Sequence, residues 1–533
     1  ISGGARRFTR YGYADLIKED RRHDVLFRMF PGTRRVLLWG DPLTAAGFGR
    51  VSHFCGAAGV DYMEPLYFKG RRGSGVPGDR CSYADPSLRT RWDWQKFLYT
   101  HRVWGRLLYN PEADPDVWRR YLKARFGEGA GPAEEALAAA TRVLQIFSTV
   151  HGVSAAHNRY WPEMYVNMSI VDPNAPKPYG DTPEPKRFGT VSPFDPEMFL
   201  SVDDTVAELL RGPRSGRHTS IEAACWLEDL AAMADTQLSA ARETVPDATD
   251  PEFRRLAIDT GIQVGLGRFF AAKLRSAVLW GLWTETGSRR ALDEALAAHR
   301  RGREAWVALA ELARGVYMED VSYGPQEYLR GHWDDRLPAI DADTARMERV
   351  LEDAADDGSS PDDGTDVSAA IDEALGRPER SSVACGHEPP ATFGPGEAVP
   401  LRLVVREEAS GTVPSGVQLR YRHVNQAEAW EAVDMTRADG AWQTTIPAPY
   451  TDSPYPLQYH FVLRKGMNGA WLYPGLGPEL VQQPYFVVRH SGMRNGSEVF
   501  ISEDQGSKAP SRSNPTEATS ASVSYTHLRA HET

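Results

Sequence analysis

Two carboxylates near the start of the chain stand directly after apolar runs. Asp41 follows Val36–Trp39 and Gly40, and Glu64 follows the stretch "VDYM". If both runs are neighbouring parallel strands, the two carboxylates lie at the edge where α/β barrels place their catalytic residues. Glycoside hydrolysis requires two carboxyl groups, about 5–5.5 Å apart in retaining enzymes and about 6.5–9.5 Å apart in inverting ones. We therefore expect Asp41 and Glu64 to be the catalytic pair, one of them acting as acid or base.

Asp41 also fits a purely structural role. Aspartate is favoured at the residue before a helix, where its carboxylate accepts hydrogen bonds from backbone N–H groups, and proline suits the first helical turn. Pro42 begins a segment of helical character, "PLTAAGFGRVSHFCGAAG". Helix capping and catalysis therefore both remain open for Asp41.

A basic, glycine-rich loop follows Glu64. In "KGRRGSG", Lys69, Arg71 and Arg72 lie among glycines that let a ligand approach the backbone. Arginine binds carboxylates and sulfates through two parallel hydrogen bonds, so we predict that these three residues bind an acidic group of a sugar. A solvated surface loop is the alternative. The stretch is not a nucleotide-binding P-loop, because no "GK[ST]" follows it.

A third stretch, "HNRYWPEMYVN", is dense in aromatic and amide groups. Sugars are bound by stacking of their C–H faces on aromatic rings and by hydrogen bonds from polar side chains. Asn158, Tyr160, Trp161 and Glu163 are therefore predicted to line a sugar subsite. The alternative is a packing loop wedged between helices.

Composition excludes some function classes. A formal net charge of −11 argues against a general nucleic-acid binder, which needs a basic surface. The four cysteines are scattered, and none has partner residues at metal-binding spacing, so the sequence predicts no metal site. Glycoside hydrolysis needs no cofactor, and we expect none. The 14 tryptophans mildly favour sugar handling, although tryptophans of a hydrophobic core account for many of them.

The elements that must position these residues are expected to form several domains, because a chain of 533 residues is too long to fold around a single hydrophobic core. Residues 1–90, with the strand-like runs "DVLFRMF", "RVLLWG" and "VDYMEPLYF", are predicted to form the C-terminal strands of a truncated (β/α)8 barrel. Residues 91–355 show apolar spacings of three and four, which predict an α-helical domain. Residues 356–384 are predicted to be an acidic linker, and residues 385–490 an immunoglobulin/fibronectin-like β-sandwich.

The two ends of the chain are expected to carry no function. Residues 491–533 are predicted to be a disordered tail, and its last stretch, "SVSYTHLRAHET", is similar to a translated sequencing adapter from a metagenomic gene. The chain begins with Ile1, which we interpret as a cut edge. No apolar run reaches the roughly 20 residues of a membrane span, and a secreted or periplasmic location is expected.

Several of these stretches resemble a known family. "YGYADLIKED", "RRVLLWGDP", "VDYMEPLYFKG" and "YTHRVWGRLLYNPEADPDVWRRYLKARFG" resemble the last barrel strands and the following helical domain of glycoside hydrolases related to the α-glucuronidases. The resemblance covers Tyr11–Gly127 and implies that this chain is the C-terminal part of a (β/α)8-barrel enzyme. No catalytic motif of the α-glucuronidases matches, so Asp41 and Glu64 are inferred from their positions alone.

The expected function is that of part of a polysaccharide-degrading glycoside hydrolase, with uronic-acid-containing glycans among its expected substrates. The parent protein is expected to be a glycosidase. This chain would hold only part of the barrel, with unpaired strand edges, and need not turn over substrate by itself. A non-catalytic carbohydrate-binding or cell-surface protein is the main alternative, and a helical scaffold with protein partners is a weaker one. The partner is then a polysaccharide or oligosaccharide, and the oligomeric state stays open.

Overall fold

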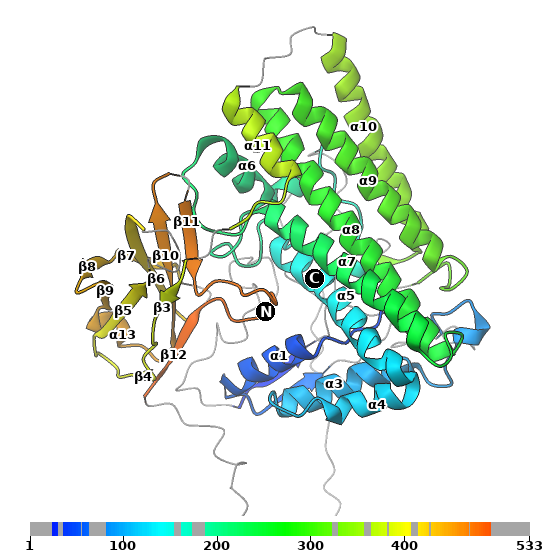
Figure 1. Ribbon diagram of the computed structural model, residues 1–533, viewed down its shortest axis with the longest axis horizontal. Helices are drawn as coiled ribbons and strands as arrows, with labels where there is room; N and C mark the ends of the chain where they lie inside the picture. Colours follow the sequence, from blue (N-terminus) through cyan, green and yellow to red (C-terminus); the bar gives the residue numbers. More distant parts are fainter. Residues whose placement is uncertain are drawn as a thin grey trace, which may run out of the picture. The chain divides into compact units, whose positions relative to one another are not determined.

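The computed structural model of the protein contains a large helical region, a two-stranded parallel sheet near the start of the described residues and two larger β-sheets (Figure 1). It describes residues 24–29, 36–54, 56–62, 81–153, 161–172, 187–321, 329–356, 364–380, 383–406, 414–425, 428–467 and 469–491.

The first described elements form a strand–helix–strand unit. Strand β1 (Leu26–Met29) pairs in parallel with β2 (Gly59–Tyr62), and helix α1 (Pro42–Phe54) lies between them in sequence. The parallel pair agrees with the prediction from the apolar runs. The predicted strand "RVLLWG" is wrong, because Val36–Gly40 belongs to no sheet of the described structure. The partial barrel stays a prediction.

The helical region agrees with the predicted amphipathic pattern. Its long helices are α3 (Leu98–Tyr109), α4 (Asp116–Phe126), α5 (Ala130–Val150), α6 (Val202–Arg211), α7 (Ser220–Thr244), α8 (Pro251–Thr286), α9 (Arg289–Ala313), α10 (Leu337–Asp356) and α11 (Thr365–Leu375).

Helix α8 is the centre of this region and packs against α5, α7 and α9 (Figure 1). Its ends are well defined: the Asp250 carboxylate accepts hydrogen bonds from the N–H groups of Glu252 and Phe253, and Gly287 ends the helix with a φ of 74°. Aspartate before the first turn favours the start of a helix, and a left-handed glycine after the last turn favours its end. Most of its side chains are buried, so α8 contributes to the core on several faces.

Helix α11 lies within residues 356–384, the predicted acidic linker. Its residues Ala370, Ile371 and Ala374 are buried in the same hydrophobic cluster as the long helices. The spacing of these three residues places them on one helix face. The density of acidic and turn residues just before the helix concealed this short amphipathic pattern.

The β-rich region contains two sheets. One has the strand order β3 (Cys385–Gly386), β5 (Val399–Val405), β9 (Ala441–Ile446), β8 (Thr436–Ala438). The other has the order β4 (Thr392–Phe393), β12 (Phe486–His490), β10 (Leu457–Lys465), β6 (Gly416–His423), β7 (Glu431–Asp434), with β11 (Gly469–Tyr473) also paired to β10.

Side chains from both sheets form one hydrophobic cluster, in which Leu401 and Leu403 of β5 join Leu419 of β6 and Phe461 of β10. Alternate residues of β6 are buried, as expected for a sheet with one face on a core. The first sheet has the A–B–E–D strand order of immunoglobulin-type sandwiches, and the second contains the C–F–G order in β6, β10 and β12, with β4, β7 and β11 as additional strands. The assignment of residues 385–490 to that class is kept as a prediction.

None of the helices in the described residues is both long enough and apolar enough to cross a membrane.

Close packing of α1 on α3 depends on a glycine. A Cβ atom added to Gly49 would lie 2.3 Å from the Leu107 carbonyl oxygen. We expect Gly49→Ala to lower the free energy of unfolding by about 1–3 kcal/mol, because the two backbones must separate. Gly105→Ala in α3 is the matched control: nothing lies within 4 Å of its added Cβ, and helix propensity should make it neutral or stabilising. Urea unfolding of both variants tests this, and equal stability would contradict the packing argument.

Candidate functional site

The segment from Val36 to Asp41, which leads to the predicted catalytic aspartate, runs through the helical region. Its backbone amides are bound by carboxylates: Glu163 Oε2 accepts from Val36 N and Leu37 N at 3.3 and 3.1 Å, and Asp259 Oδ2 accepts from Leu38 N at 2.8 Å. The backbone polar groups that a strand would pair in a sheet are thus bound by side chains.

The next part of the segment continues this pattern. Gly40 N donates to Thr141 Oγ1 at 3.1 Å, and Gln263 Nε2 donates to the Leu38 carbonyl at 3.2 Å. The Trp39 carbonyl accepts a hydrogen bond from Thr100 Oγ1 at 2.5 Å. Helices α3, α5 and α8 therefore fix the path of the chain up to Asp41.

Asp41 lies at the N-terminus of α1 and forms an ion pair. Its carboxylate accepts from Leu43 N at 3.3 Å, and Arg142 of α5 binds it through Nε at 2.9 Å and Nη2 at 3.1 Å. The Asp41 side chain is 0% exposed and that of Arg142 is 12% exposed. Burial lowers the pKa of Arg142, but the hydrogen bonds to Asp41 outweigh it and leave this pKa raised. The contacts are those of the capping alternative, and the catalytic role of Asp41 stays a prediction.

Of the predicted sugar subsite, Trp161 and Glu163 lie in the described residues. Both are buried, at 1% and 0% exposure. The Glu163 carbonyl accepts from Trp333 Nε1 at 2.8 Å, while its carboxylate holds Val36 and Leu37 as described above. These contacts favour the packing-loop alternative for this part of the stretch. The predicted site residues Glu64, Lys69, Arg71, Arg72, Asn158 and Tyr160 lie outside the described residues.

A buried ion pair that the sequence patterns did not predict lies next to the segment Val36–Asp41. Lys96 Nζ is 2.9 Å from Asp259 Oδ2, with side-chain exposures of 4% and 0%, and it donates to Tyr317 Oη at 2.9 Å. Tyr317 in turn donates to Asp259 Oδ1 and stacks on Tyr83. Burial lowers the pKa of Lys96 and raises that of Tyr317. The only signal in the sequence was a lone aspartate in the apolar stretch of α8.

A second buried lysine lies further along α8. Lys273 Nζ donates to Asn167 Oδ1 at 2.6 Å, and the rings of Phe188 and Phe269 lie 5.0 and 5.8 Å from it. Burial lowers the pKa of Lys273 to about 8. A lysine with a lowered pKa is able to act as base or nucleophile, but at 2% exposure Lys273 lies within the core.

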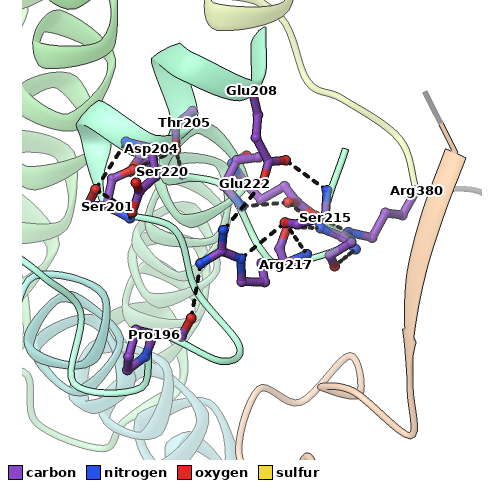
Figure 2. Close-up of polar contacts among 12 residues, drawn as sticks. Pro196, Ser201, Asp204, Thr205, Glu208, Ser215, Arg217, Ser220, Glu222 and Arg380 are labelled. Atoms are coloured by element: carbon purple, nitrogen blue, oxygen red, sulfur yellow. Dashed lines mark hydrogen bonds and ion pairs between the residues drawn. The ribbon is translucent and has the colours of Figure 1, made fainter. Parts of the chain in front are cut away.

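A polar network fastens the turn between α6 and α7, as Figure 2 shows. The Arg380 guanidinium binds both carboxylate oxygens of Glu222, at 2.5 and 2.8 Å, and donates to the carbonyls of Gly216 and Arg217. Burial raises the pKa of Glu222, but the hydrogen bonds from Arg380 and His218 outweigh it and lower this pKa well below its usual value. Arg380 lies in the segment that leads from α11 to β3. Its hydrogen bonds to Glu222 therefore attach this segment to helix α7.

A pair of carboxylates, Asp195 and Glu197, joins the helical region to the β-rich region. Arg420 of β6 binds Glu197 through two hydrogen bonds of 2.8 and 3.0 Å, and His460 Nε2 of β10 lies 3.0 Å from Glu197 Oε1. Tyr485 Oη donates to Asp195 Oδ2 at 2.6 Å. Burial raises the pKa of Asp195. Two carboxyl groups with opposite shifts resemble an acid/base pair, but their contacts here are those of an interface.

The pKa of Glu197 predicts a loss of stability in acid. Burial raises it, but hydrogen bonds from His460 and Arg420 lower it from 4.5 to about 2. The folded state thus binds this proton less tightly than the unfolded state, so Glu197 stabilises the fold above pH 4.5 and this contribution disappears as the pH falls towards 2. We expect Glu197→Gln to cost about 3 kcal/mol at pH 6 and progressively less below pH 4.5. Urea unfolding between pH 6 and 3 tests this, and a cost independent of pH would contradict it.

Comparisons with known proteins assign no family. No protein-family model matches the chain, and the search of curated proteins finds no match. Among solved structures, the chain is similar to a GH138 enzyme targeting pectin rhamnogalacturonan II, with 12% identity and a TM-score of 0.49. The similarity covers 61% of this chain and 47% of that one, so this chain spans about half of the solved chain's length.

Proposed function

We propose that this chain is part of a glycoside hydrolase that degrades polysaccharides, with uronic-acid-containing glycans among its substrates. The observation that carries the proposal is the resemblance of "YTHRVWGRLLYNPEADPDVWRRYLKARFG" and the preceding stretches to the barrel end and helical domain of enzymes related to the α-glucuronidases. The order of the described elements supports it: a parallel strand–helix–strand unit precedes α3, α4 and the longer helices, as the resemblance implies.

The catalytic part of the proposal assigns a paired-carboxylate mechanism to Asp41 and Glu64. One carboxyl group protonates the leaving oxygen, and the other acts as nucleophile or activates water. Lys69, Arg71 and Arg72 bind the acidic group of the substrate, and Asn158, Tyr160, Trp161 and Glu163 line a subsite. Because Asp41, Trp161 and Glu163 are buried in structural contacts, Glu64 gives the sharpest test.

The test uses the longer reading frame to which this chain belongs, screened for sugar release from polygalacturonate and from neutral polysaccharides. We expect release from at least one substrate, and a loss of about 10²–10⁴-fold in Glu64→Gln with an unchanged melting temperature. Glu112→Gln is the control, because this exposed residue pairs with Arg50 on the surface. Activity of Glu64→Gln within tenfold of the wild type would refute the assignment.

The rival function is a protein that binds carbohydrate without cleaving it. It is favoured by one observation, the complete burial of the Asp41 carboxylate against Arg142. It predicts that the same screen detects polysaccharide binding but no released sugar, and that residues 385–490 bind saccharide on their own.

A further inference from the structure

Two tryptophans differ from all the others in this chain. Trp92 and Trp94 are 54% and 51% exposed, whereas the other twelve of the 14 tryptophans are buried or partly buried. A large aromatic ring left in water loses the stabilisation that burial would give it. Two such rings within three residues of the chain therefore leave apolar area exposed to solvent.

The backbone that carries these rings is held in a hydrogen-bonded turn. Residues Asp93–Gln95 form a 3₁₀ turn, in which Trp92 N donates to Gln95 Oε1 at 2.9 Å and Gln95 N donates to the Trp92 carbonyl at 3.0 Å. The next residue, Lys96, is anchored in the core by its ion pair with Asp259. A surface already held in one conformation loses little conformational freedom when a ligand binds.

The two tryptophans lie in a stretch of sequence with a small excess of positive charge, although the chain as a whole is acidic. Arg89 and Arg91 are exposed, and the Arg91 guanidinium lies 5.5 Å from the centroid of the Trp92 ring. Arg89 is oriented by a hydrogen bond of 3.2 Å from its Nε to the Tyr83 carbonyl. Within Arg89–Trp94, two arginines outnumber the single acid, Asp93. An anionic ligand is therefore favoured over a cationic one.

From these features we infer that Trp92 and Trp94, with Arg89 and Arg91, form a surface site that binds an acidic polysaccharide. The pyranose rings of the ligand stack on the indole rings, and uronate carboxylates accept hydrogen bonds from the arginines. A protein partner fits less well, because no exposed large aliphatic side chain accompanies the two rings within residues 81–97. The inference rests on the proposed function and names binding residues that are not among its catalytic residues.

The test measures binding of the full chain to soluble polygalacturonate and to neutral galactan by affinity electrophoresis. We expect wild type to bind polygalacturonate, and the double variant W92A/W94A to bind it at least about tenfold more weakly. Arg91→Gln should weaken binding to polygalacturonate and leave galactan binding unchanged. Tyr109→Ala is the control, since Tyr109 is an aromatic residue with 72% exposure at the end of α3. Melting temperatures verify that each variant is folded.

Each outcome bears on the inference. Binding that is lost in W92A/W94A but retained in Tyr109→Ala supports it, whereas equal binding by the wild type and the double variant, or no binding by the wild type, overturns it. The proposed function fails separately: if the longer protein releases no sugar while this chain binds through the two tryptophans, the binding site stands without the hydrolase. If the longer protein releases sugar but polysaccharide binding is unchanged in W92A/W94A, the proposed function stands and the inferred binding site fails.

Discussion

Asp259→Asn is expected to lower the free energy of unfolding by about 3–5 kcal/mol, because it leaves the Lys96 ammonium buried without a counter-charge. The carboxylate of Asp259 has three partners: Lys96 Nζ at 2.9 Å, Leu38 N at 2.8 Å and the Tyr317 hydroxyl. An amide offers only one oxygen acceptor and its NH₂ group faces other donors. Urea unfolding at neutral pH measures the loss.

The matched control is Asp235→Asn, which removes the partner of Arg268 on the surface between α7 and α8. Both side chains of that pair are about half exposed, at 49% and 53%, so we expect a change below about 1 kcal/mol. A double variant, Lys96→Met with Asp259→Leu, should recover much of the stability lost in Asp259→Asn, because no uncompensated charge remains. If Asp259→Asn proved as mild as Asp235→Asn, the buried ion pair would have no importance for stability.

Asp41→Asn should destabilise the fold by a similar amount, about 3–5 kcal/mol. The substitution removes the buried carboxylate from the Arg142 guanidinium, which is 12% exposed and keeps only the half-exposed carboxylate of Glu479, at 3.2 Å. The cap of α1 is affected less, because asparagine is also a good N-cap residue. Thermal unfolding of wild type, Asp41→Asn and Arg142→Met measures the effect, and the double variant measures the coupling between the two residues.

The same variant also separates the two roles of Asp41. If Asp41 only caps α1 and pairs with Arg142, the activity of the longer protein carrying Asp41→Asn should fall in proportion to the folded fraction and return at lower temperature. A catalytic residue predicts a loss of activity at every temperature at which the variant is folded. Glu112→Gln again serves as control, since Arg50 and Glu112 of the surface pair are 56% and 73% exposed. An Asp41→Asn variant as stable as the wild type would contradict the ion-pair argument.

The elements that sequence patterns could predict are those with a repeating apolar period. Helices α5, α7 and α9 follow from apolar residues three and four positions apart, and the alternate burial of β6 follows from a period of two. Such periods reflect one buried face, which is a local property of the chain. Helix α11 was missed because its pattern spans only 11 residues beside an acidic stretch.

The segment Val36–Gly40 shows why the rest could not be predicted. An apolar run of this length is typical of a buried strand, and the side chains of Val36–Trp39 are indeed buried. What a strand needs in addition is a neighbouring backbone, and here Glu163, Thr141 and Asp259 take its place. Those partners are more than 100 residues away in sequence, and no spacing rule connects them. For the same reason the sequence pattern at Asp41 predicts a strand-end carboxylate and does not indicate Arg142, its partner 101 residues later.

The hydrogen bonds that join Val36–Gly40 to the helices also affect how the chain folds during synthesis. The partners that fix Leu38 lie 221 and 225 residues later, on α8. At about 5–20 residues per second, the ribosome needs roughly 10–45 s to deliver them after Leu38 has emerged. Throughout that interval the apolar side chains of "VLLW" have no completed core to enter. The early apolar segment can therefore reach its native hydrogen-bond partners, and the helical region can close around it, only after α8 has left the ribosome.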